Sequence, residues 1–209
     1  MKHGLFLGAL GASLLVAAHA VQAVTLTSVT LNGNDNNGVL IEPTLLGIDA
    51  GLRNFSPITF NFTRTPNSAA MYDFNSVLEN LSGFNWGAVS YQLTGGAYFS
   101  PVPGSTTGYG SVTPSFGTIS SVLLQPPVDP TSVRVGFAGL VGEPNQFVLG
   151  NPFGLVGPLD WQLSLARVAV GDSFSVVINA TPIPVPGGLV LMLSGLVAAG
   201  TLLRRKRAV

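Results

Sequence analysis

Cysteine is absent from this 209-residue chain, and charged residues are scarce. Asp, Glu, Lys and Arg together make up 9% of the residues, against about 25% in a typical soluble domain. Both histidines, His3 and His19, lie near the N-terminus, so residues 24–209 contain neither histidine nor cysteine. This excludes Ser-His-Asp and Cys-His catalysis from that part of the chain, and zinc, iron or copper sites built on those ligands. The formal net charge is zero, which excludes a basic surface for nucleic acid.

The few charges are unevenly distributed along the chain. Residues 24–181 contain four arginines against nine acidic residues, a formal charge of −5, and no lysine. The remaining basic residues are Lys2 and a cluster at 204–207. Length and pattern together predict three segments: residues 1–23, a single domain over 24–181, and a C-terminal segment over 182–209.

The N-terminal segment has the three parts of a secretory signal peptide. Lys2 provides a positive charge, residues 4–18 form an almost unbroken apolar run, and two small-residue cleavage motifs follow, ending at Ala20 and Ala23. We expect cleavage after Ala23, because the mature chain would then begin with the strand-like residues 24–27. Cleavage after Ala20 is the alternative. The apolar run is short for a membrane span, which argues against an uncleaved anchor.

The C-terminal segment combines three features in order. Residues 182–188 are rich in proline and glycine, and their alternating prolines favour an extended, accessible backbone. Residues 189–203 are uncharged and apolar, and with the residues before them they approach the roughly 20 needed to cross a bilayer, so we predict a transmembrane helix. A basic cluster follows, which would stop translocation and keep the C-terminus in the cytoplasm. The stop-transfer residues are Arg204, Arg205, Lys206 and Arg207.

This order, paired with a signal peptide, resembles the PEP-CTERM sorting domain found in Gram-negative bacteria that make extracellular polysaccharide. The resemblance covers roughly residues 182–207. Val185 stands where the eponymous Pro-Glu-Pro motif has glutamate, and the motif is more similar to the Val-Pro-Leu-Pro-Ala-Gly variant. The motif residues are Ile183, Pro184, Val185, Pro186, Gly187 and Gly188. The resemblance implies that an exosortase, a membrane cysteine transpeptidase, recognises and cuts the chain at this motif.

The resemblance also implies a route and a role. The protein would cross the cytoplasmic membrane, remain anchored there transiently, and then reach the cell envelope, the cell surface or the extracellular matrix. Its role there would be structural or adhesive, associated with exopolysaccharide or biofilm. A second class fits the same sequence: a permanently anchored type I membrane protein whose ectodomain binds glycan.

Residues 24–181 have the pattern of a mainly β domain. Apolar and polar residues alternate in several short stretches, which indicates half-buried strands. The clearest stretches are 58–63, 88–94, 133–137, 161–165 and 174–178. Near the start of the domain the alternation slips at Ser28, which predicts a β-bulge. The pattern predicts one antiparallel, jelly-roll-like β-sandwich that is held together by burial without disulfides.

One segment has helical spacing in place of alternation. Its apolar residues follow one another at intervals typical of one face of a helix, and a glycine, Gly83, comes after the last of them. These apolar residues are Ala70, Phe74, Val77, Leu78 and Leu81. We predict a short amphipathic helix over 68–82 that covers one end of the sandwich.

The domain offers few candidates for catalysis or ligand binding. It contains no glycine-rich phosphate loop or nucleophile elbow, and no spacing singles out a carboxylate pair, so we expect no enzyme, cofactor or metal. The oxygen-rich stretch 32–38 has the composition of a calcium loop, but Pro43 stands where an EF-hand needs its bidentate glutamate. We therefore predict a turn in which Asn and Gly accept positive φ.

Aromatic side chains could stack on sugar rings. Trp86 is the candidate glycan contact, because it lies between Asn85 and Gly87 at the start of a strand. Tyr91 and Trp161 fall on core-facing registers, so we expect both to pack in the core.

Overall fold

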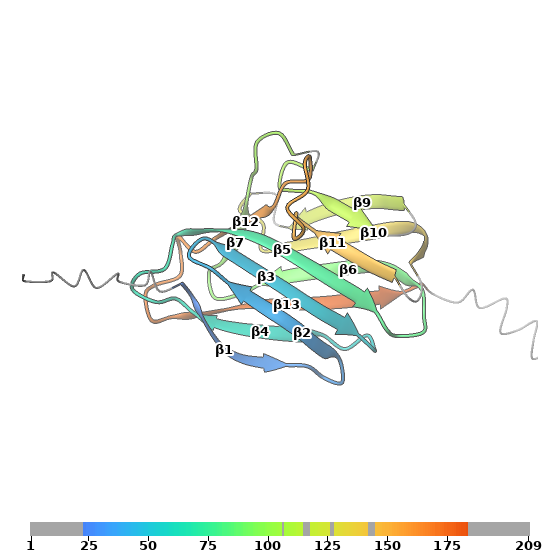
Figure 1. The fold of residues 1–209 in the computed structure, drawn as a ribbon, viewed down its shortest axis with the longest axis horizontal. Helices are drawn as coiled ribbons and strands as arrows, with labels where there is room; N and C mark the ends of the chain where they lie inside the picture. Colours follow the sequence, from blue (N-terminus) through green and yellow to red (C-terminus); the bar gives the residue numbers. More distant parts are fainter. Residues whose placement is uncertain (1–22, 106, 115–117, 126–127, 142–144, 184–209) are drawn as a thin grey trace, which may run out of the picture.

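The computed structural model describes residues 23–105, 107–114, 118–125, 128–141 and 145–183, and these contain thirteen β-strands and no helix. The strands form two sheets that stack face to face (Figure 1). The mainly β, two-layer fold expected from the alternating pattern is confirmed. Each sheet is apolar on its inner face, and stacking removes both of these faces from water.

One sheet has six strands, and every neighbouring pair in it is antiparallel. In spatial order the strands are β1 (Thr25–Thr30), β4 (Ile58–Thr63), β13 (Ser173–Pro182), β6 (Trp86–Leu93), β10 (Ser132–Val141) and β9 (Thr118–Gln125). Four of the five alternating stretches lie in this sheet, on β4, β6, β10 and β13. The register of β1 on β4 shifts between Leu26 and Ser28, which confirms the predicted bulge.

The other sheet has seven strands and contains one parallel pair. Its strands are β2 (Asp35–Ile41), β3 (Leu45–Leu52), β5 (Met71–Asn80), β11 (Asn145–Leu149), β8 (Val112–Pro114), β12 (Trp161–Ser164) and β7 (Tyr98–Ser100). β3 and β5 run parallel, so the prediction of an entirely antiparallel sandwich is wrong at this pair. The chain between them passes through β4 in the opposite sheet, and this crossover lets β5 return in the same direction as β3.

The predicted helix over 68–82 is wrong, because residues 71–80 form β5 in the middle of this sheet. Tyr72, Phe74 and Leu78 point into the core, while Asn75 and Val77 on the opposite face are also buried. A central strand that is covered on both faces does not alternate between apolar and polar residues. In β5 the alternation breaks where polar Ser76 lies on the inner face and apolar Val77 lies on the outer face. The remaining apolar residues then match helical spacing by coincidence.

The core lies between the two sheets and forms one cluster that includes residues of both. Tyr91 and Trp161 are fully buried in it, as their registers predict. The hydroxyl of Tyr91 on the six-stranded sheet donates to Oγ of Ser76 on the seven-stranded sheet at 3.0 Å, and burial raises the pKa of Tyr91. The rings of Phe62 and Phe174, on neighbouring strands, stack with centroids 5.2 Å apart.

The described chain enters and leaves the sandwich at opposite ends. β1 begins at the left of Figure 1, and β13 ends at the right. β13 extends to Pro182, one residue beyond the expected domain boundary at Thr181. We use the term exit end for the end where β13 finishes, formed by the loops 31–34, 53–57 and 81–85 together with Ile183.

Candidate functional site

The predicted sorting motif begins where the described chain ends. Ile183 is exposed, and its N–H donates to the carbonyl O of Asn85 at 3.1 Å. The rest of the motif, the expected membrane span over 189–203 and the basic cluster lie outside the described residues. Within the described ranges, no helix is both long and apolar enough to cross a membrane. Of the predicted sorting residues, Ile183 is the one that the structure describes, and it lies at the edge of the folded domain.

Of the two predicted signal-cleavage residues, the structure describes Ala23, which lies beside a buried stretch of backbone. Ala20 is outside the described residues, but the carbonyl O of Ala23 accepts a hydrogen bond from Oγ1 of Thr65 at 3.0 Å. Val24 is 4% exposed, and its N–H donates to the hydroxyl of Tyr72 at 3.1 Å. Cleavage after Ala23 would convert this buried N–H into an α-ammonium group, and burying a charge is costly. If residues 1–23 contain a cleaved signal peptide, these contacts favour cleavage after Ala20 over cleavage after Ala23.

Trp86 does not lie on the surface. It is 0% exposed at the start of β6, opposite Val141 of β10 and Pro182 of β13. The register shifts at both of these pairings, and the indole ring packs in the core. A ring without exposed surface cannot stack on a sugar, so the prediction that Trp86 contacts glycan is wrong. The sequence alone could not show that the Trp86 side chain points into the core, because irregular pairing at a strand end breaks the simple alternation of inward and outward side chains.

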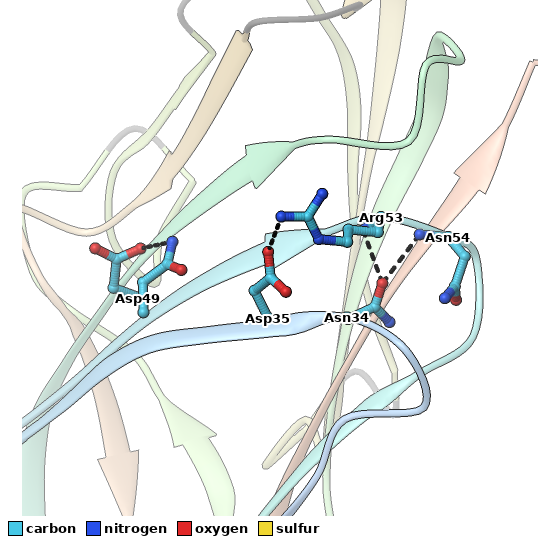
Figure 2. A network of polar contacts seen from close by, with 6 residues as sticks. Asn34, Asp35, Asp49, Arg53 and Asn54 are labelled. Atoms are coloured by element: carbon cyan, nitrogen blue, oxygen red, sulfur yellow. Dashed lines mark hydrogen bonds and ion pairs between the residues drawn. The ribbon is translucent and has the colours of Figure 1, made fainter.

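The asparagine-rich stretch over 32–38 forms a turn and then the start of β2. Asn32 and Gly33 have φ of 50° and 84°, as expected for a turn built on Asn and Gly. Figure 2 shows that Oδ1 of Asn34 accepts from the backbone N–H groups of Arg53 and Asn54, at 2.8 Å and 3.0 Å. Its Nδ2 donates to the carbonyl O of Ser56 at 2.8 Å. The side chain of Asn34 thus fixes the turn before β2 against the loop after β3.

Neighbouring side chains of the same stretch also contact β3 and the loop that follows it. Arg53 forms an ion pair with Asp35 at 2.8 Å, and Nδ2 of Asn37 donates to Oδ1 of Asp49 at 3.2 Å (Figure 2). Within the part of the chain that the structure describes, no three His, Cys, Asp or Glu side chains group closely enough to hold a metal ion. The Asn and Asp side chains whose composition is typical of a calcium loop therefore form contacts that connect the turn and β2 to β3 and the loop after it.

A groove crosses the outer face of the seven-stranded sheet and has a volume of about 380 Å³. We call it the outer groove. β2, β3 and β5 supply its floor and one wall, and the loop between β11 and β12 supplies the other wall. Its lining consists of Gly38, Val39, Leu40, Gly47, Ile48, Asp49, Asn75, Val77, Pro152 and Phe153. This volume lies within the range of about 300–1,000 Å³ that is typical of small-molecule sites.

Glycine on β3 gives the outer groove its depth. Leu40, Gly47 and Asn75 are lateral neighbours on β2, β3 and β5. A Cβ added to Gly47 would lie 3.0 Å from Oδ1 of Asn75 and 3.3 Å from Cβ of Leu40, so a side chain there would fill the space between them. A glycine inside a strand often marks a place where a ligand can approach the backbone closely.

Two carboxyl groups are associated with the Asn75 side of the outer groove. Oδ1 of Asp160 accepts from the backbone N–H of Asn151 at 2.6 Å and from Nδ2 of Asn75 at 3.2 Å. The pKa of Asp73 is raised, mainly because burial disfavours its charged form and secondarily because the negative charge of Asp160 is near. The hydrogen bonds of Asp160 fix the loop at Asn151 to β5, which gives this carboxylate a structural role.

The loop over 150–159 presents apolar side chains to solvent beside the outer groove. Phe153, Leu155 and Val156 are 60%, 59% and 104% exposed. Asn151 holds the loop, since its Oδ1 accepts from the N–H of Leu155 at 2.8 Å and its Nδ2 donates to the carbonyl O of the same residue at 2.9 Å. A second cavity of about 210 Å³ lies beside the first and shares Pro152 and Phe153 with it. An exposed phenylalanine on a fixed loop is the kind of surface that can pack against the apolar face of a sugar ring.

Sequence reasoning missed the outer groove. Its residues come from four separated segments, and only the parallel pairing of β3 with β5 brings Gly47 next to Asn75. The signal that the sequence does contain is the turn-like Asn151-Pro152-Phe153-Gly154, in which an apolar ring stands between turn-forming residues.

The chain matches no protein-family model, no curated protein and no solved structure.

Proposed function

We propose that the protein is an exported, non-enzymatic surface or extracellular-matrix protein that an exosortase sorts and processes at residues 183–188. The observation that carries this proposal is the C-terminal sequence: a proline-rich motif, an apolar run and a basic cluster in uninterrupted order. Its role would be structural or adhesive, in association with exopolysaccharide.

The folded domain is compatible with removal of the C-terminal segment. The buried core is made by residues that precede the motif, from Val24 to Ala180. β13 ends at Pro182, and Ile183 is exposed. A cut within 184–188 would therefore leave the described core residues in one piece. The core contains no disulfide, so burial of apolar surface has to hold the released domain together.

The processing step can be tested on protein recovered from its native cells. Intact-mass and C-terminal peptide mass spectrometry should give a chain that ends between Pro184 and Gly188 and lacks the segment 189–209. A double variant, Pro184→Ala with Pro186→Ala, should accumulate with its C-terminal segment retained. Pro182→Ala is the matched control, because it makes the same change inside β13 and should be processed normally. A wild-type chain that keeps residues 189–209 in such cells would overturn the sorting proposal.

The outer groove favours a second function, that of a permanently anchored protein whose ectodomain binds glycan. The specific observation is the exposed ring of Phe153 beside the buried amide of Asn75, which offers both an apolar surface and a hydrogen-bonding group. Phe153→Ala should weaken binding to polysaccharide from the producing cells. Leu123→Ala removes an apolar side chain that is 53% exposed on the other sheet, and it should bind like the wild type. Equal binding by all three proteins would remove this function from the outer groove.

A further inference from the structure

The three loops of the exit end contact one another. Nδ2 of Asn32 donates to the carbonyl O of Pro57 at 2.8 Å, which joins the first loop to the second. The rings of Phe55 and Phe84 pack with centroids 6.0 Å apart, which joins the second loop to the third. Ile183 is joined to the third loop through the carbonyl O of Asn85. These contacts make the exit end one continuous surface.

This surface is apolar at its tip, and the three described loops that form it carry little charge. Phe84 is 63% exposed and Ile183 is 38% exposed. Within the loops 31–34, 53–57 and 81–85 one residue is charged, Arg53, and it is ion-paired with Asp35 at 2.8 Å. The other polar side chains of these three loops are the amides of asparagine and the hydroxyls of serine.

The opposite end of the sandwich differs in charge. Its described turns include two arginines and three acidic residues, and two of these charges pair with each other, Arg167 with Asp129. The charged residues there are Glu42, Arg64, Asp129, Arg167 and Asp172. Bringing a charged group against an apolar layer is costly, so the exit end loses less hydration free energy than the opposite end when it meets a lipid surface.

The length of chain beyond the domain determines how far this end could lie from a membrane. Six residues, 183–188, separate Pro182 from the apolar run that begins at Leu189. At about 3.1 Å per residue for an extended proline-rich segment, they span at most roughly 19 Å. The polar headgroup region on each side of the hydrocarbon core is itself about 5–8 Å thick. While the apolar run spans the bilayer, the exit end is therefore held within roughly 19 Å of the hydrocarbon core, which is within reach of the headgroups.

We infer that, in the anchored precursor, Phe84 and Ile183 dock the exit end on the phospholipid surface of the outer leaflet of the cytoplasmic membrane. This inference rests on the proposed function, because the anchor at 189–203 supplies the tether. Exposed apolar rings enter the boundary between headgroups and acyl chains, which buries apolar surface without inserting backbone. The domain then stands upright, with its charged end directed away from the bilayer.

The absence of cysteine allows a direct test with single-cysteine variants of the full chain. Phe84→Cys places an environment-sensitive fluorophore at the exit end, and Ile183→Cys does so at a second position of the same surface. Val170→Cys is the control, because Val170 is 53% exposed in the loop before β13 at the opposite end. Each labelled chain is reconstituted into vesicles of phosphatidylcholine and phosphatidylglycerol, with a quencher attached to the lipid near the glycerol group.

If the exit end docks on the lipid surface, the quencher lipid should lower the fluorescence at positions 84 and 183 and leave it unchanged at position 170. Equal signals at all three positions, whether quenched or unquenched, would overturn it. Flotation of the vesicles on a density gradient tests the anchor separately. A chain that floats but shows no quenching at 84 and 183 overturns the docking alone. A chain that does not float overturns the anchor on which both proposals depend.

Discussion

Replacement of Trp86 by alanine distinguishes a core residue from a sugar-binding residue. The ring is 0% exposed at the start of β6, so Trp86→Ala removes a fully buried side chain and leaves a cavity. Substitutions of this kind cost about 3–5 kcal/mol, a large part of the 5–15 kcal/mol by which a typical domain is stable. For a domain of this size each kcal/mol lowers Tm by about 2–4 °C, so we expect a fall of roughly 6–20 °C.

The assay is thermal and urea unfolding of residues 21–183, followed by far-ultraviolet circular dichroism, because the mutation removes one of only two tryptophans. Trp86→Phe is the matched control. It keeps a large aromatic ring, and within the described part of the chain Nε1 of Trp86 has no hydrogen-bond partner to lose. Its cost should therefore be clearly smaller than that of Trp86→Ala. An unchanged Tm in Trp86→Ala, together with lost polysaccharide binding, would refute this reasoning and show that Trp86 is a sugar-binding residue on the surface.

Two further predictions concern processing and pH. N-terminal sequencing of the mature protein should give Val21 as its first residue, and a chain that begins at Val24 would show that the buried backbone there tolerates a terminal ammonium group. The raised pKa of Asp73 means that the folded state keeps this proton to a higher pH than the unfolded state does. The free energy of unfolding should therefore fall as pH rises from the ordinary value of 3.8 through the raised pKa. Asp73→Asn should remove this fall and Asp160→Asn should reduce it, as measured by urea midpoints on both sides of that window; an Asp73→Asn profile that matches the wild type would contradict the assignment.

The strands that the sequence predicted well are those with one face in the core and one face in solvent. In β4 the three apolar residues, Ile58, Phe60 and Phe62, are fully buried, and the polar residues between them are partly exposed. Period-two alternation is the direct consequence of this environment. The bulge at Ser28 could also be predicted, because a change of parity within a strand requires an extra residue in the ladder.

Two predictions that were wrong, the helix over 68–82 and the glycan contact at Trp86, have a common physical cause. In both, burial depends on residues far away in the sequence. β5 lacks alternation because β3, β11 and β12 pair with both its edges and the loop at Pro152 and Phe153 lies over its outer face. Trp86 points inward because of irregular pairing with β10 and β13. Neither arrangement leaves a signal within the segment itself, and the outer groove is missed for the same reason.

The position of β13 determines when the domain can finish folding. It is the last strand in the sequence, yet it lies inside the six-stranded sheet between β4 and β6. In the described ladders it alone joins β1 and β4 to β6, β10 and β9. A chain that emerges N-terminus first cannot close this sheet until Pro182 has emerged. On the proposed export route the sorting motif begins at the next residue. The six-stranded sheet can therefore close only when the motif itself reaches the membrane.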